Sequence, residues 1–153
     1  YATMVTKTAD ALSDLYLADE TAWLDSMAER IRAGRLDELD YAHLAEYLED
    51  MAIRDRREVN SRLKVLILHL LKWDYQPDMR TSSWQASIMN QQDELEGLLE
   101  SGTLRNHALA SLATVYPKAV NLASAETTLP PSTFPAECPW TLDQLMSSEI
   151  LGG

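Results

Sequence analysis

The fold is decided by residues 54–73, which read RDRREVNSRLKVLILHLLKW. Large apolar side chains recur in this stretch at alternating spacings of four and three residues: Val59, Leu63, Leu66, Leu70 and Trp73. This spacing predicts an α-helix that packs at a shallow angle against neighbouring helices. Because almost every position from Val65 to Leu71 is apolar, we expect this half to be buried on all sides. The stretch is therefore predicted to be the central helix of a bundle.

Further helices are predicted on the N-terminal side of this stretch. A short helix or arm covers Asp10–Leu17, and a longer helix covers Asp19–Ala33, with Asp19 as its N-cap and Gly34 as its stop. Its apolar stripe consists of Trp23, Leu24, Met27 and Ile31. Asp40 caps another helix, which ends near Met51. The residues expected on the buried side of that helix are Tyr41, Leu44, Ala45 and Leu48.

Two more helices are predicted after the connection that contains Pro77. Ser82 and Gln85 have the spacing of a capping box and open the first, which ends at Ser101-Gly102. The second begins at Thr103 and keeps a helical apolar pattern as far as Leu122. Pro117 lies inside that pattern, so a kink or break is expected near Tyr116.

The C-terminal tail has a different character, with four prolines between Leu129 and Trp140. Such a segment is extended or turn-like, and Phe134 and Trp140 favour a strap packed across the bundle. Thr141 and Gln144 predict a capping box at the start of a short terminal helix. The prediction is one all-α domain over residues 1–153, with a bundle of about five helices over 10–127 and the strap and terminal helix over 128–153.

The composition limits the classes of protein to consider. The chain has 153 residues, a formal net charge of −11 and one cysteine, Cys138. These values predict a soluble cytoplasmic protein without a disulfide, and no stretch is apolar enough to span a bilayer. The segment Arg54–Arg80 departs from this balance, with seven basic residues against four acidic ones. It either neutralises acidic neighbours within the fold or forms a docking patch for an anion.

The central stretch continues into a distinctive sequence, SRLKVLILHLLKWDYQP over residues 61–77. Shorter matches follow the same order along the chain: Trp23, Gly34-Arg35, Leu39-Asp40, Ser83-Trp84, Leu129-Pro130 and Phe134–Pro139. Together they resemble the bacterial family called domain of unknown function 29, over roughly residues 12–146. The resemblance implies a helical fold and carries no activity or catalytic residue. The chain departs from the family pattern at His43, where asparagine is usual, at Tyr47, where glutamate is usual, and at Ala52, where glycine is expected.

His43 and Glu46 are candidate metal ligands, because residues three apart lie on neighbouring positions of a helix. Metal sites in helical bundles use Glu-x-x-His pairs from several helices. Here the order is reversed, and Glu46 lies nearly opposite the face of Leu44 and Leu48. A solvated polar face is the simpler interpretation, so no metal is assigned.

His69 is the candidate for acid–base catalysis, with Arg62 and Lys72 on the same flank of the central helix. The simpler interpretation is a partly buried histidine that is hydrogen-bonded to a neighbouring helix, with Lys72 reaching outward. Cys138 has acidic and proline neighbours that do not favour a reactive thiolate. The five glycines form no phosphate-binding loop, so no nucleotide cofactor is expected.

Three functional hypotheses follow. The first is a non-enzymatic module that binds a basic protein partner through its acidic surface, and a homo-oligomer would fit the same features. The second is a metal-dependent or hydrolase-like enzyme centred on His69, with His43 and Glu46. The third is nucleic-acid binding by residues 54–80, which the overall negative charge opposes.

Overall fold

The computed structural model describes residues 11–152. These residues form helices, short 3-10 turns and connections, with no strand among them, so the predicted all-α fold is confirmed. The chain divides into two compact units, Tyr1–Ala52 and Ile53–Gly153, called here the N-terminal unit and the C-terminal unit. The single domain expected over residues 1–153 stays a prediction.

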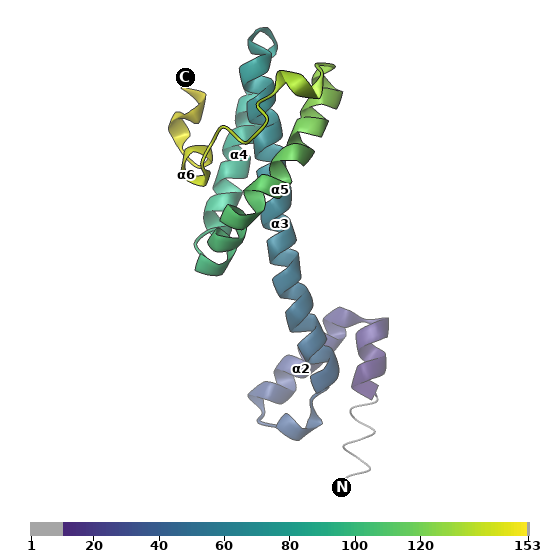
Figure 1. The fold of residues 1–153 in the computed structure, drawn as a ribbon. Coiled ribbons are helices and arrows are strands. Elements are labelled where there is room, and N and C mark those ends of the chain that lie inside the picture. Colours follow the sequence, from purple (N-terminus) through teal and green to yellow (C-terminus); the bar gives the residue numbers. More distant parts are fainter. Residues whose placement is uncertain (1–10, 153) are drawn as a thin grey trace. The chain divides into compact units, whose positions relative to one another are not determined.

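Helix α3 (Tyr41–Tyr75) contributes residues to both units (Figure 1). Separate helices ending near Met51 and beginning at Arg54 were expected from the sequence, and that expectation is wrong. Met51, Ala52 and Ile53 join the two stretches, and neither glycine nor proline interrupts them. Asp40 precedes the helix as predicted, and its backbone carbonyl accepts from the amide of Leu44 at 2.9 Å.

The N-terminal unit is built on a helix over residues 11–18, α2 (Glu20–Arg32), the 3-10 turn η1 (Leu36–Glu38) and the start of α3. Residue 10 of the predicted arm lies outside the described residues. Asp19 caps α2, as predicted, by accepting from the amide of Ala22 at 3.1 Å. Gly34 follows the helix with a φ of 75°, a left-handed conformation that glycine adopts without strain. Among the described residues of this unit, the buried core is small and consists of Leu12, Trp23, Met27 and Leu39.

The start of α3 packs on that core through a different side from the one predicted. Leu44 and Tyr47 lie against the core, whereas Tyr41 and Leu48 are 58% and 59% exposed and Ala45 is exposed. Placing Tyr41, Ala45 and Leu48 on the buried side was therefore wrong. The physical reason is that Trp23 packs near Tyr47, with their ring centres 6.0 Å apart, which leaves the adjacent side of the helix, with Tyr41 and Leu48, facing water. Ile31, also expected to be buried, is exposed.

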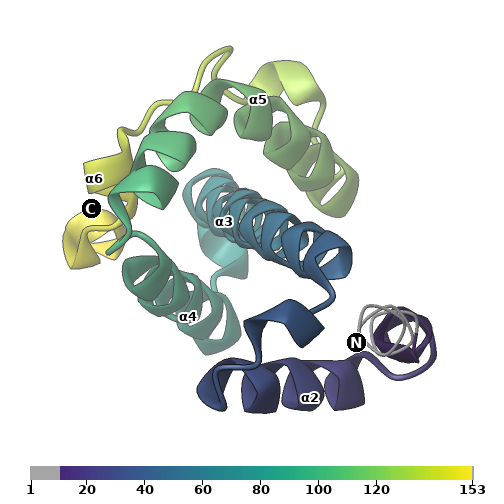
Figure 2. The same cartoon turned by 90° about the horizontal axis from the view of Figure 1, so that it is seen from below.

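The C-terminal unit consists of the rest of α3, α4 (Ser82–Leu98), α5 (Gly102–Thr127) and the tail, which pack around one large apolar core (Figure 2). Within the central stretch, all positions from Leu66 to Leu71 except His69 are buried, while Val65 and His69 are half-buried. Burial on all sides is therefore confirmed only in part. Three of the core leucines and valines predicted from spacing, Val59, Leu63 and Leu66, are fully buried.

The ends of α4 and α5 differ slightly from the predicted ones. Thr81, not Ser82, caps α4 by accepting from the amide of Trp84 at 3.1 Å, so the capping box predicted from Ser82 and Gln85 is wrong. Ser101 caps α5 in the same way. Helix α5 is not broken at Pro117 and continues to Thr127, bending along its length (Figure 2).

The tail crosses the C-terminal unit as the predicted strap (Figure 1). It contains the 3-10 turns η3 (Pro131–Thr133) and η4 (Ser148–Leu151) and the short helix α6 (Leu142–Leu145). Phe134 is buried, and the hydroxyl of Tyr116 donates to the carbonyl of Pro135 at 2.7 Å. The capping box of Thr141 and Gln144 is present, as predicted. The tail is thus fixed by the buried ring of Phe134, by hydrogen bonds from Tyr116 and Ser124 of α5 and from Gln92 of α4, and by a capped terminal helix.

Candidate functional site

The five candidate residues from the sequence fall into two groups. His43 and Glu46 belong to the N-terminal unit, whereas Arg62, His69 and Lys72 belong to the C-terminal unit. Each group is described within its own unit.

In the N-terminal unit, His43 is the centre of a polar and aromatic cluster. Its Nδ1 lies 2.7 Å from Oδ2 of Asp40 and 3.3 Å from Oγ of Ser13. The ring of Tyr16 stacks on the imidazole, with centroids 4.2 Å apart. Asp40 is buried, and its Oδ2 also accepts from Nε1 of Trp23 at 3.2 Å. One buried carboxylate therefore connects the indole of α2 to the imidazole of α3.

This arrangement differs from that of a catalytic triad. In a Ser–His–Asp triad, the carboxylate holds Nδ1 and the nucleophile lies at Nε2. Here Asp40 and Ser13 both approach Nδ1 of His43, so Ser13 is not placed to pass a proton to Nε2. The geometry is that of a histidine oriented by a buried carboxylate and covered by an aromatic ring.

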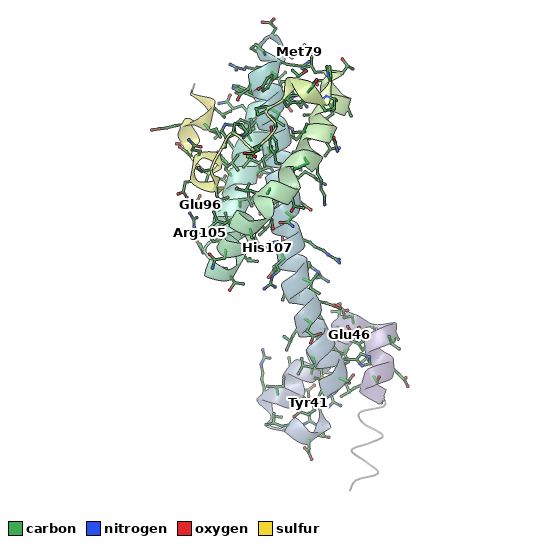
Figure 3. The ribbon with its side chains drawn as sticks, in the orientation of Figure 1. Tyr41, Glu46, Met79, Glu96, Arg105 and His107 are labelled. Carbon is green, nitrogen blue, oxygen red and sulfur yellow. The ribbon has the colours of Figure 1, made fainter. Side chains whose placement is uncertain are left out.

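Glu46 lies on an exposed part of α3 (Figure 3). Partial burial, and after it the carboxylate of Glu46, raise the pKa of Tyr16. No group of three or more histidine, cysteine, aspartate or glutamate side chains gathers with metal-binding geometry anywhere in residues 11–152. The charge of Glu46 therefore reaches the His43 cluster at Tyr16.

In the C-terminal unit, His69 bonds within its own helix. Its Nδ1 lies 2.9 Å from the carbonyl of Val65, and because a carbonyl only accepts, Nδ1 carries the proton in this contact. The partial burial expected of His69 is confirmed, but the expectation that its partner lies on a neighbouring helix is wrong, because the carbonyl of Val65 one turn earlier in α3 already accepts its proton.

Arg62 and Lys72 are held by neighbouring helices rather than directed at His69. Arg62 contacts Glu58 at 3.0 Å, Gln91 at 3.2 Å and Glu94 at 3.7 Å, which ties α3 to α4. Lys72 is 3.3 Å from Glu126 of α5 and 4.5 Å from the ring centre of Trp84 in α4. Both cations therefore have structural partners, and the structure shows no hydrogen bond or ion pair that joins either of them to His69 among the described residues.

Cys138 also has a structural environment. Its thiol donates to the carbonyl of Trp140 at 3.3 Å. Burial raises the pKa of Cys138. A thiol with a raised pKa is a weak nucleophile at neutral pH, in line with the interpretation of the sequence.

Surface cavities of the C-terminal unit have opposite charge characters. One, of about 380 Å³, carries Asp93, Glu96 and Glu100 beside Arg105, and Figure 3 shows Glu96 and Arg105 close together. Arg105 itself pairs with Asp143 at 2.6 Å. Another, of about 290 Å³, is lined by three basic residues, Arg57, Lys64 and Lys118. The sequence indicated a basic segment but gave no sign that Lys118, far along the chain, would join it.

The fold and these sites define a small all-α protein with a carboxylate-oriented histidine and a basic surface cavity. A family model described as "Domain of unknown function DUF29" matches residues 15–151, so the chain belongs to that family, as the resemblance indicated. Searches of curated proteins and of solved structures find no match. None of the helices among residues 11–152 combines the length and the apolar character needed to cross a bilayer.

Proposed function

We propose that this protein is a non-catalytic interaction module whose N-terminal unit binds a protein with a basic surface. The observation that carries this proposal is the distribution of charge. Residues 1–52 contain twelve acidic and four basic residues, so their formal charge is −8 out of −11 for the whole chain. An acidic surface of this kind attracts basic partners and repels acidic ones.

The N-terminal unit also offers an apolar surface for such a partner. Tyr41, Ala45 and Leu48 are spaced four and three residues apart, so they lie along one side of α3, and all three are exposed. We call them the α3 stripe. Protein interfaces combine an apolar centre with a polar rim. A single exposed leucine is common on a protein surface, whereas several exposed apolar residues along one side of a helix are less common.

A carboxylate flanks the α3 stripe. At about 100° per residue, Glu49 lies beside Ala45, whereas Glu46 lies on the far side of the helix. Glu49 is exposed. A partner that covers the stripe therefore meets Glu49 at its edge, which favours lysine or arginine there.

The charge of the N-terminal unit also indicates that the partner bound at the α3 stripe is a different protein and not a second copy of this chain. Two N-terminal units brought together through the α3 stripe would place two surfaces of formal charge −8 against each other. Like charges across an interface oppose association. A homo-oligomer predicts a larger mass in light scattering of the purified protein, which separates it from the proposal.

The test is a capture experiment with matched variants. The protein is immobilised and exposed to nuclease-treated lysate of its native host, and retained proteins are identified by mass spectrometry. Leu48→Ser changes the stripe, and Leu109→Ser is the control, because Leu109 is a leucine of similar exposure, 52%, in the other unit. Glu49→Lys tests the charge, with Glu96→Lys of the C-terminal unit as its control.

The proposal expects a protein with a basic surface that the native chain and both controls retain, that Leu48→Ser and Glu49→Lys lose, and that added salt releases. Retention of the same proteins by all variants would overturn it, and so would a blank capture. An unchanged circular dichroism spectrum of each variant ensures that a loss of binding is not a loss of folding.

A further inference from the structure

The basic cavity of the C-terminal unit is formed by one side of α3 and one side of α5. Arg57, Ser61 and Lys64 are spaced four and three residues apart on α3, while Thr114 and Lys118 are four apart on α5. Asn60 and the buried Val115 complete the walls. Three basic residues and two residues with hydroxyl side chains therefore line one hollow, and its lining contains no acidic residue.

The three cations of this cavity lack an ion-pair partner in the part of the chain that the structure describes. Elsewhere Arg62, Lys72 and Arg105 each form an ion pair with a carboxylate. Within residues 11–152, no ion pair is found for Arg57, Lys64 or Lys118. The chain has 24 acidic residues to use as partners, yet none lines this cavity. Three like charges held together repel one another, and an anion bound between them would remove that repulsion.

The size and chemistry of the lining restrict the anion. A volume of about 290 Å³ is at the lower end of the range for ligand sites, roughly 300–1,000 Å³. A guanidinium binds two oxygens of a phosphate at once, lysines bind it as point charges, and serine and threonine hydroxyls donate to its remaining oxygens. The lining has no aromatic side chain on which a nucleobase could stack.

We propose that this cavity binds the phosphate group of a small molecule, either inorganic phosphate or a phosphomonoester. Arg57 and Lys64 hold the group from α3, Lys118 holds it from α5, and Ser61 and Thr114 donate from their hydroxyls. The bound anion would join the two helices through charges that otherwise repel. This site is independent of the proposed docking by the N-terminal unit, since all of its residues belong to the C-terminal unit.

The experiment is isothermal titration calorimetry of the full chain in a phosphate-free buffer at low ionic strength. The probes are inorganic phosphate, glycerol phosphate, sulfate and chloride, with a short single-stranded oligonucleotide as a fifth. The variants are Lys118→Gln and the double change Lys64→Gln with Lys118→Gln. Arg54→Gln is the control, because Arg54 is an exposed cation on the same helix that does not line the cavity. Lys118 is exposed, so the single variant keeps the test available if the double variant does not fold.

The proposal expects phosphate or the phosphomonoester to bind at one site, Lys118→Gln to weaken binding about tenfold, the double variant to abolish it, and Arg54→Gln to leave it unchanged. Preference for the phosphomonoester over inorganic phosphate would identify the source of the group. No binding of either probe at millimolar concentration would overturn the proposal. So would equal binding of chloride, or equal weakening by Arg54→Gln, since both indicate a general charge effect. Binding of the oligonucleotide alone, lost in the same variants, would overturn it in favour of nucleic acid.

Discussion

The two units reach a helical fold by different means. The C-terminal unit buries about twenty apolar and aromatic residues in one cluster, and Arg62, Lys72 and Arg105 form ion pairs with carboxylates in this unit. Among residues 11–52, the N-terminal unit buries four apolar residues, and one of them, Trp23, is hydrogen-bonded to Asp40, which also contacts His43. From this difference we infer that the stability of the C-terminal unit depends mainly on buried apolar area. The stability of the N-terminal unit depends more on the hydrogen bonds of one buried carboxylate, that of Asp40. Substitutions in the apolar core and at the buried carboxylate should therefore affect the stability of the two units differently.

The largest expected effect is in the apolar core of the C-terminal unit. Leu66→Ala removes a fully buried side chain, and the cost in unfolding free energy should be about 2–5 kcal/mol, because a cavity remains. Urea unfolding followed by circular dichroism measures this loss. Leu109→Ala, at an exposed position of the same unit, should change the free energy by less than about 0.5 kcal/mol. Similar losses in the two variants would contradict the assignment of the core.

The next largest loss of stability is expected from substitution of Asp40 in the N-terminal unit, and this loss should be confined mainly to that unit. Asp40→Ala leaves Nε1 of Trp23 and Nδ1 of His43 without their acceptor, which should cost about 2–3 kcal/mol. Asp40→Asn keeps an acceptor for the indole and should cost less. Hydrogen exchange read by mass spectrometry should show faster exchange in residues 11–52 than in residues 53–152. Equal acceleration throughout the chain would show that the two units unfold together.

The sequence was sufficient where the signal is local. The spacing of Leu63, Leu66 and Leu70 located the core helix, Asp19 located a cap, and Thr141 with Gln144 located the last helix. The sequence was insufficient where one segment has two apolar sides, either of which could be the buried side of the helix. The segment 41–51 has one apolar side with Leu44 and Tyr47 and another with Tyr41 and Leu48. Only the position of Trp23 decides which is buried, and that is a contact between helices.

The candidate sites show the same limit. Arg62 and Lys72 were placed correctly on α3, but their partners Glu94 and Glu126 come from α4 and α5. Lys118 lines the basic cavity because α5 packs on α3. No pattern in the sequence around Lys118 predicts that contact. Asp40 was identified as a helix cap, whereas its bonds to Trp23 and His43 depend on the packing of α2. The spacing of residues along a helix predicts which side chains share one side of it. The role of those side chains depends on the residues of other helices that pack against that side.

The smallest expected effect concerns the strap of the C-terminal unit, and it depends on pH. Burial raises the pKa of Tyr116 from 10.0 to about 12, with the neighbouring Cys138 and Tyr75 adding to the shift. The folded protein therefore keeps this phenolic proton at pH values where the unfolded chain has lost it. The stability that the neutral phenol contributes is complete below about pH 10 and is lost as the pH rises toward 12.

Tyr116→Phe isolates this contribution, because phenylalanine keeps the buried ring and removes the titrating hydroxyl. Near pH 8 the variant should be less stable by about 1 kcal/mol, the value of the lost hydrogen bond to the carbonyl of Pro135. As the pH rises above about 10, only the native chain loses the contribution of this phenol, so the difference between the two proteins should close or reverse. Urea unfolding at a series of pH values measures it. A difference that stays constant across this range would show that the hydroxyl of Tyr116 is open to water, and that the strap is held by Phe134 and the terminal helix instead.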